Sequence, residues 1–281
     1  MATIRPLSGV SKPLAKLIAA VSRALGRFYE PSPVRHKAKA GARLLLERTL
    51  DAKELTRRAK ERAEHREVRR QRNIERIIEL AKAELPETVN DRPVDEDWVA
   101  YFFTLSQDVG DEVMQTLWAR ILAGEVGQPG SYSLRTLGTV RTLRKEDAHL
   151  FSRYCCYVWE MGNGAKGVLT STHVNRWLAE HGFSSLELER LRNLQLVGSA
   201  LRYSLVEVEF APSAYYFGEQ YRFSGSLISI LSRYVSAVHL TDVGAELFPL
   251  SGARRDPEYL DLLIRSLKDE DGIVVSRVDA S

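Results

Sequence analysis

The segment from Asp111 to Trp159 has the most regular pattern of apolar and polar residues in the chain. Its first apolar residues follow one another at intervals of one and three, which places them on one face of an α-helix. These residues are Val113, Met114, Leu117, Trp118, Ile121 and Leu122. Asp111 can cap this helix by accepting N–H groups of the first turn. Pro129-Gly130 then turns the chain, so the pattern predicts a short capped helix.

The same segment predicts two further short helices. The second follows Ser131 or Ser133, either of which can cap it, and its apolar stripe consists of Leu134, Leu137, Val140 and Leu143. The third follows Lys145, and its buried side consists of Ala148, Phe151, Cys155, Val158 and Trp159. Asp95 can cap another helix that begins near Trp98. We therefore expect a compact helical core over residues 91–160.

The N-terminal part, residues 1–34, is expected to hold one amphipathic helix that Ser11 can cap and Pro31 ends. Its polar face is nearly all basic, and its apolar stripe consists of Leu14, Leu17, Ile18, Val21, Leu25 and Phe28. We favour packing of this stripe on the rest of the protein or on a second copy, because most such stripes belong to a core. The alternative is that the helix lies on an anionic membrane surface.

Residues 35–90 are expected to form one long charged helix, or two helices with a weak joint, because Arg35 to Leu85 holds no proline and is rich in strong helix formers. The middle of this helix has few large apolar residues and a positive charge carried by Arg57, Arg58, Arg62, Arg66, Arg69, Arg70 and Arg72. Clustered arginines can contact the phosphates of a nucleic acid. We favour a solvated or oligomer-forming helix, because runs of charge are more often solvated surfaces.

Residues 161–270 show the order of a winged helix-turn-helix: helix, turn, helix, then a hairpin of strands around residues 203–208 and 215–223. The glycine-rich residues 161–169 that precede it are expected to form a loop. On the second helix the exposed Arg190, Arg192 and Asn193 are candidates for nucleic-acid binding. The mixed charges of that helix suit protein contact equally well. Residues 271–281 are expected to form a tail with an edge strand.

Three motifs stand out within a longer stretch that begins at NIERIIELAKAELP: the helix sequence LWARILAGE, the loop PGSYS after it and the helix end DAHLF. This stretch resembles the uncharacterised bacterial family DUF2806. A looser version of this layout resembles the Abi-alpha abortive-infection proteins, and the opening PLAKLIAAVSRALGRFYEP resembles both groups. The resemblance covers roughly residues 10 to 265. It implies a bacterial, mostly helical protein with a link to phage defence, and it brings no catalytic residues.

The composition, 27% charged and 44% hydrophobic over 281 residues, is that of a globular protein. The two cysteines, Cys155 and Cys156, are adjacent, which suits neither a mutual disulfide nor a shared metal site. No apolar run is long enough to span a bilayer. The six histidines are not spaced as metal ligands, and no catalytic or phosphate-binding motif is present. We therefore expect no cofactor and no metal, and we favour a protein that is not an enzyme.

These patterns predict a mainly α protein with a long N-terminal helix, a helical core and a small α+β, winged-helix-like C-terminal domain. We expect a non-enzymatic, cytoplasmic effector or interaction protein, homo-oligomeric, with a role in phage defence. One alternative is a nucleic-acid-binding regulator that uses the arginine-rich helix and the winged helix. Another is an effector that acts at the inner membrane through its N-terminal amphipathic helix.

Overall fold

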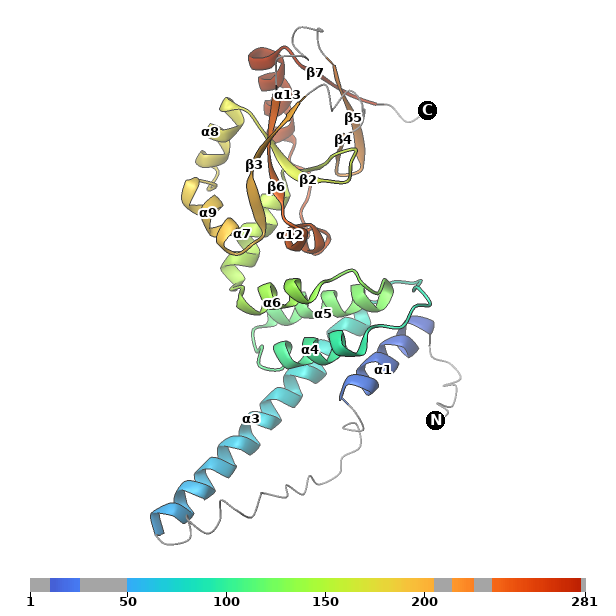
Figure 1. Ribbon diagram of the computed structural model, residues 1–281, viewed down its shortest axis with the longest axis vertical. Helices are drawn as coiled ribbons and strands as arrows, with labels where there is room; N and C mark the ends of the chain where they lie inside the picture. Colours follow the sequence, from blue (N-terminus) through green and yellow to red (C-terminus); the bar gives the residue numbers. More distant parts are fainter. Residues whose placement is uncertain (1–10, 26–49, 205–213, 225–233, 279–281) are drawn as a thin grey trace. The chain divides into compact units, whose positions relative to one another are not determined.

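Figure 1 shows the fold as a computed structural model, which describes residues 11–25, 50–204, 214–224 and 234–278. Contacts within the chain divide it into two compact units, Met1–Leu137 and Gly138–Ser281. The described residues form ten α-helices and one seven-stranded sheet, which confirms the mainly α class. Phe28 and residues 35–49 of the predicted long helix lie outside the described part of the chain, as do residues 205–213 of the predicted hairpin.

Unit 1 is a helical bundle. Its elements are α1 (Lys12–Leu25), α3 (Leu50–Ala83), α4 (Glu96–Ser106), α5 (Glu112–Gly127) and the first turn of α6 (Leu134–Thr142). Helix α5 packs against α3, and α1 packs against α4 and α5. The predicted caps are confirmed: Asp95 accepts the N–H of Trp98 at 2.9 Å, and Asp111 accepts that of Val113 at 3.0 Å.

Aromatic rings fill the centre of unit 1. Phe102 of α4 stacks on Trp98 with ring centroids 5.3 Å apart and meets the ring of Trp118 edge-on at 5.2 Å. Trp118 and Phe102 are fully buried. The predicted stripe of α5 is thus confirmed in part: Met114, Ile121 and Leu122 are buried beside Trp118 in the core of this unit. Leu117 is half-buried and Val113 is 47% exposed, so Val113 does not belong to the core.

The loop after α5 is organised by a buried carboxylate. Glu125, 2% exposed, accepts the backbone N–H groups of Gly130 at 2.6 Å and Tyr132 at 3.1 Å. The indole N–H of Trp98 donates to the carbonyl of Tyr132 at 2.7 Å. A Cβ added at Gly124 would lie 2.9 Å from the ring of Tyr132. The LAGE and PGSYS motifs therefore build one packed corner of the bundle.

Unit 2 consists of one antiparallel sheet with helices around it. Its helices are α7 (Lys145–Cys155), α8 (Thr172–Glu180), α9 (Ser185–Asn193), α12 (Asp242–Leu247) and α13 (Pro257–Asp271), with the 3-10 helix η2 (Phe248–Leu250). The strands are β1 (Val158–Glu160), β2 (Lys166–Thr170), β3 (Val197–Ser204), β4 (Ala214–Tyr216), β5 (Glu219–Ser224), β6 (Tyr234–Leu240) and β7 (Val274–Arg277). Their order in the sheet is β3-β6-β2-β1-β4-β5-β7.

The prediction that Val158 and Trp159 belong to a helix is wrong. Helix α7 ends at Cys155, and these two residues begin strand β1, where Trp159 pairs with Gly167 of β2. The predicted loop over 161–169 is therefore the turn and second strand of a hairpin. Gly164 has φ of +82° in the turn, and a Cβ at Gly167 would lie 3.0 Å from the carbonyl oxygen of Val238. Hairpin formation thus overrides a helical spacing that these apolar residues also fit.

The predicted hairpin between residues 203–208 and 215–223 also needs correction. Strand β3 pairs with β6, whereas β4 pairs with β5 and β1. The short turn at Phe217 and Gly218 closes β4 onto β5, so the segment around 215–223 forms a hairpin of its own. The predicted edge strand near the C-terminus is confirmed, since β7 lies at the end of the sheet beside β5.

A buried aromatic group joins the sheet to α13. The hydroxyl of Tyr259 donates to the carbonyl of Leu169 at 2.9 Å and lies 3.2 Å from the indole nitrogen of Trp159. The ring of Tyr216 stacks on Trp159 with centroids 4.9 Å apart. Burial raises the pKa of Tyr259 well above its ordinary value. This side of the sheet is therefore a closed core.

Glu270 of α13 caps the first turn of α8. Its carboxylate accepts the backbone N–H groups of Thr172 at 3.0 Å and His173 at 3.1 Å, and the hydroxyl of Ser266 at 2.6 Å. Burial alone would raise the pKa of Glu270, but the hydrogen bonds from Ser266 and the α8 backbone outweigh it and lower the pKa to about 2. The capped carboxylate therefore stabilises the fold only while it is ionised.

A Glu270→Gln variant is expected to be less stable near neutral pH by roughly 1–2 kcal/mol, because the amide accepts these bonds more weakly and the site is partly solvated. An unfolded glutamate has a pKa of about 4.3. The stabilisation is therefore complete above pH ~4.3 and is lost as the pH falls towards about 2. Urea unfolding at several pH values should show the difference between wild type and variant shrinking over that interval. The exposed Glu258→Gln serves as control, and a difference independent of pH would contradict the capping role.

Candidate nucleic-acid interface on helix α3

Helix α3 has two parts with different surroundings. Its C-terminal part packs into the bundle of unit 1 through the buried Ile74, Ile77 and Ala81. Along its N-terminal part, the two large apolar residues Leu55 and Val68 are 62% and 50% exposed. Figure 1 shows this part extending away from α4 and α5 as a single helix. Most of its side chains are therefore available to a partner.

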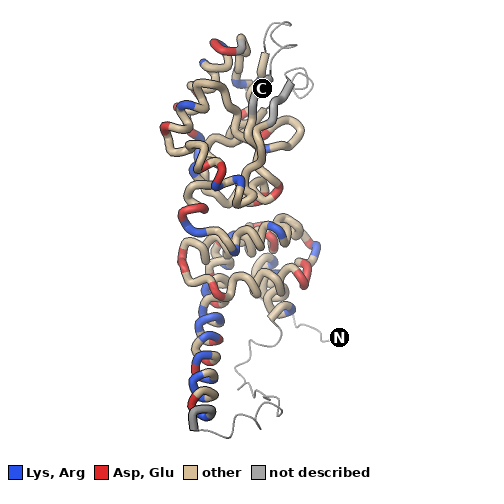
Figure 2. Tube along the Cα trace, turned by 60° about the vertical axis from the view of Figure 1, so that its left-hand side comes forward, with Lys and Arg blue, Asp and Glu red and all other residues tan. Residues whose placement is uncertain are grey.

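Six arginines occupy one face of α3, and we call them the arginine stripe. They follow one another at intervals of three or four residues, all are exposed, and they are Arg58, Arg62, Arg66, Arg69, Arg72 and Arg76. Residues at these intervals are neighbours on a helix surface. At a rise of about 1.5 Å per residue, the stripe is about 27 Å long. Figure 2 shows basic residues repeating along this helix.

The stripe is only partly neutralised by the protein's own acids. Arg58 contacts Glu54 at 2.7 Å, and Arg69 contacts Asp108 at 3.0 Å. Arg66 lies 3.8 Å from Glu67. Among the described residues, no carboxylate forms an ion pair with Arg62, Arg72 or Arg76. A positive field therefore remains along this face.

Two of the arginines singled out in the sequence point away from the stripe. Arg57 is held by Glu54 at 2.7 Å and Glu61 at 2.6 Å. Arg70 donates to both carboxylate oxygens of Asp108, at 2.9 and 2.8 Å. The hydrogen bond to Asp108 raises the pKa of Arg70, and that to Glu54 raises the pKa of Arg57. These two side chains serve the fold of the helix rather than its exposed face.

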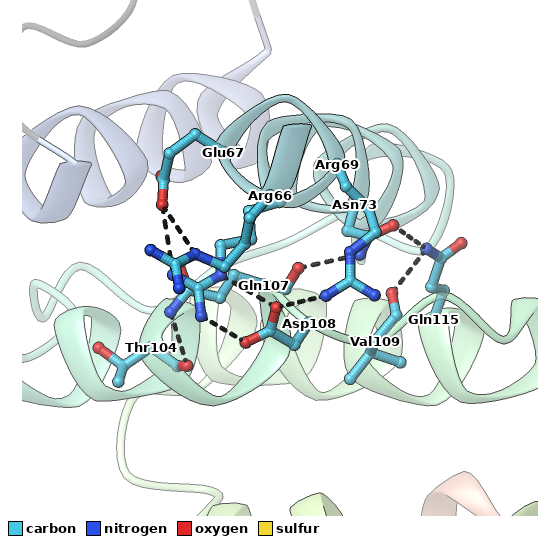
Figure 3. Close-up of polar contacts among 10 residues, drawn as sticks. Arg66, Glu67, Arg69, Asn73, Thr104, Gln107, Asp108, Val109 and Gln115 are labelled. Atoms are coloured by element: carbon cyan, nitrogen blue, oxygen red, sulfur yellow. Dashed lines mark hydrogen bonds and ion pairs between the residues drawn. The ribbon is translucent and has the colours of Figure 1, made fainter. Parts of the chain in front are cut away.

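Polar contacts fix α3 where it leaves the bundle (Figure 3). The amide of Asn73 donates to the carbonyl of Gln107 at 2.9 Å. The amide of Gln115 donates to Asn73 at 3.3 Å and to the carbonyl of Val109 at 2.9 Å. Together with Asp108, these bonds tie α3 to the turn between α4 and α5. The direction in which the stripe faces is therefore set by the bundle.

The surface of the stripe is uneven. A hollow of about 570 Å³ lies along it, lined by Ala59, Arg62, Ala63, His65, Arg66 and Arg69. The two alanines are small, so the guanidinium groups beside them flank a depression. This shape gives an anionic group access to more than one arginine at a time.

The candidates on α9 are largely engaged within unit 2. Arg190 donates through Nε to the buried Asp147 at 2.5 Å. Arg192 donates to the carbonyl of Gly198 and to Glu189, both at 3.4 Å. Asn193 is exposed. The surface of α9 thus has little net positive charge of its own.

The candidates on α1 lie mostly against the bundle. Leu17 and Val21 are buried, Leu14 and Leu25 are half-buried, and Ile18 is 39% exposed. The basic side chains of α1 also have partners in unit 1. Lys12 pairs with Asp91 at 2.5 Å, Lys16 donates to the carbonyl of Asn90 at 2.7 Å, and Arg23 lies 3.5 Å from Glu96.

Sequence reasoning missed Arg76 as a member of the stripe. It follows Arg72 by four residues, so the helical interval could have identified it. Arg76 lies among Ile74, Ile77 and Ile78, and these apolar residues indicate a buried segment. Only the face of α3 that carries these isoleucines is buried, and Arg76 lies on the exposed face.

The described residues hold neither a cluster of metal ligands nor a helix that could span a membrane. Within residues 11–25, 50–204, 214–224 and 234–278, no three His, Cys, Asp or Glu side chains are grouped as metal ligands. In the same ranges, no helix combines the length and the apolar character that crossing a bilayer requires.

Comparison with known proteins gives one positive result. No curated protein and no solved structure matches the chain. The family described as "Protein of unknown function (DUF2806)" matches residues 57–208, more than half of the chain. The looser resemblance to the Abi-alpha proteins stays a prediction. The chain therefore belongs to the DUF2806 family.

Proposed function

We propose that this protein binds nucleic acid through the arginine stripe of α3. The observation that carries this proposal is the continuity of the stripe: six exposed arginines on one face of a helix that projects from its bundle. Duplex DNA carries one phosphate charge per about 1.7 Å of its axis. A face about 27 Å long therefore meets more phosphates than it has arginines.

The chemistry of these side chains favours contact with the backbone of the nucleic acid. A guanidinium group donates two parallel hydrogen bonds to a phosphate, and it stays protonated at every physiological pH. Contacts with phosphates position a protein without reading sequence. We therefore expect binding that depends strongly on salt and weakly on base sequence.

A winged helix in unit 2 is the second part of the proposal. Its support is that, apart from β1 and the inserted β4–β5 hairpin, the elements follow the order α7, β2, α8, α9, β3 and β6, with β6 lying between β3 and β2 in the sheet. In such a fold α9 is the recognition helix. Because Asp147 and Glu189 engage its arginines, we expect α9 to add less affinity than α3.

The other expected roles have weaker support. Membrane binding through α1 would require Leu17 and Val21 to leave the core of unit 1. A homo-oligomeric state, a protein partner and a role in phage defence stay predictions.

Charge reversal at three arginines of the stripe tests the proposal. An Arg62→Glu/Arg66→Glu/Arg72→Glu variant is expected to bind labelled duplex DNA about 100-fold more weakly at about 0.1 M salt, because three phosphate contacts become repulsive. Fluorescence anisotropy measures the affinity, and circular dichroism checks that the helix remains.

The matched control reverses three cations on the other side of α3. The variant Lys53→Glu/Arg57→Glu/Lys60→Glu changes the net charge by the same amount. Its affinity for duplex DNA is expected to fall by less than about tenfold. Equal losses in the two variants would show that total charge, not the stripe, drives binding. Absence of binding by the wild-type protein at low salt would remove the proposal.

A further inference from the structure

One side of the sheet in unit 2 holds a pocket that the proposed function does not use. Trp159 and Tyr216 point to the closed core, so the alternating residues Val158, Glu160 and Tyr215 point to the opposite side. There η2 and residues 251–253 form a second wall. The space between them is about 460 Å³, within the range of small-molecule sites.

The lining of this pocket has a definite chemical character. Three aromatic rings contribute to it, from Tyr215, Phe217 and Phe248, together with Pro249. The rings of Phe217 and Phe248 have centroids 6.4 Å apart, and Tyr215 and Phe217 are 38% and 36% exposed. Among the described residues that line the pocket, Glu160 is the only charged one.

Strand pairing places the carboxylate beside a ring. Glu160 of β1 is directly opposite Tyr215 of β4 in the antiparallel register. Lys166 lies 3.2 Å from one carboxylate oxygen, and half of the Glu160 side chain is exposed. The Lys166 side chain is 23% exposed, so the ion pair is partly exposed to solvent. A single pair of this kind contributes little stability, so an arriving cation can compete with Lys166 for the carboxylate.

The backbone at Phe217 is an independent sign of a site. Phe217 has φ of +50° and Gly218 has φ of +81°, in the two-residue turn between β4 and β5. Asn, Asp and Gly are the residues that such turns favour, and a phenylalanine there is strained. The strained residue places its ring on the pocket, and strain of this kind gathers at functional positions.

We infer that this pocket binds an organic cation, either a substituted ammonium or a guanidinium group. The faces of aromatic rings attract such cations, and the carboxylate of Glu160 supplies the opposite charge. The cation can belong to a free small molecule or to a lysine or arginine side chain that a peptide presents. This inference is independent of nucleic-acid binding by α3.

The test compares a cation with its neutral isostere. Choline and 3,3-dimethylbutanol have the same shape and differ in the charged nitrogen. Titrations followed by the amide NMR signals of Gly218 and Gly252 are expected to show about tenfold tighter binding of choline. Acetyl-arginine amide and acetyl-lysine amide, tested beside choline, show which source of the cation is preferred. Equal affinity for the isostere, or no shift with any of the cations, would overturn the inference.

Two variants separate binding from folding. Phe217→Asn removes the ring and relieves the backbone, so it is expected to keep or raise the unfolding temperature while choline binds about tenfold more weakly. Glu160→Gln keeps the shape and is expected to weaken choline binding by about fivefold without changing binding of the isostere. Unchanged choline affinity in both variants would also overturn the inference.

Discussion

A Glu125→Ala variant is expected to lose about 3 kcal/mol or more of the free energy of unfolding of unit 1. The carboxylate of Glu125 is buried and accepts two backbone N–H groups, at 2.6 and 3.1 Å. Alanine leaves both donors without their acceptor and opens a cavity beside Tyr132. The loss is therefore larger than that of an ordinary surface substitution.

Hydrogen exchange on peptides from α4 and α5, with denaturant unfolding, measures the effect of Glu125→Ala. Glu112→Ala is the control on the same helix, because Glu112 is exposed, and it is expected to cost less than about 1 kcal/mol. A Glu125→Ala protein with wild-type protection in α4 and α5 would show that the buried carboxylate does not organise this corner.

A Gly244→Ala variant is expected to destabilise unit 2 by at least about 3 kcal/mol. A Cβ at residue 244 would lie 2.0 Å from the carbonyl oxygen of Leu196, which no backbone tolerates without moving. The same carbonyl accepts the N–H of Thr241 at 3.2 Å, and Thr241 caps α12 by accepting the N–H of Gly244 at 3.1 Å. Relief of the clash therefore disturbs the start of α12 and the turn before β3.

Gly198→Ala is the matched control for Gly244→Ala. Its added Cβ would lie 3.8 Å from the carbonyl oxygen of His239, an ordinary contact, so its stability is expected to change by less than about 1 kcal/mol. Thermal unfolding and hydrogen exchange in β3 and β6 compare the two variants. Similar stability of both would contradict the tight packing of α12 on the turn at Leu196.

Local signals in the sequence predicted the helices of unit 1 well. The caps at Asp95 and Asp111 and the buried stripe of α5 depend on residues within one turn of each other, so spacing alone identifies them. Thr241, the N-cap of α12, is a local signal of the same kind. These features need no knowledge of the rest of the chain.

Features that depend on distant partners were not predicted. Val158 and Trp159 fit a helical stripe, and their place in β1 depends on pairing with Lys166–Thr170. The pairing of β3 with β6 joins strands separated by the whole β4–β5 hairpin. Which arginines of α3 remain available depended on Asp108, which is nearly forty residues away along the chain. The sequence therefore indicated a basic helix but not which face of it is open.

The salt dependence of duplex DNA binding is the most direct test that the stripe is a phosphate-binding face. The logarithm of the DNA-binding constant is expected to fall steeply with the logarithm of the salt concentration for the wild-type protein. For the variant Arg62→Ala/Arg66→Ala/Arg72→Ala this slope is expected to be less steep by about 2.7, because three phosphate contacts are removed. Equal slopes for the two proteins, or wild-type binding that does not respond to salt, would contradict the assignment of the stripe.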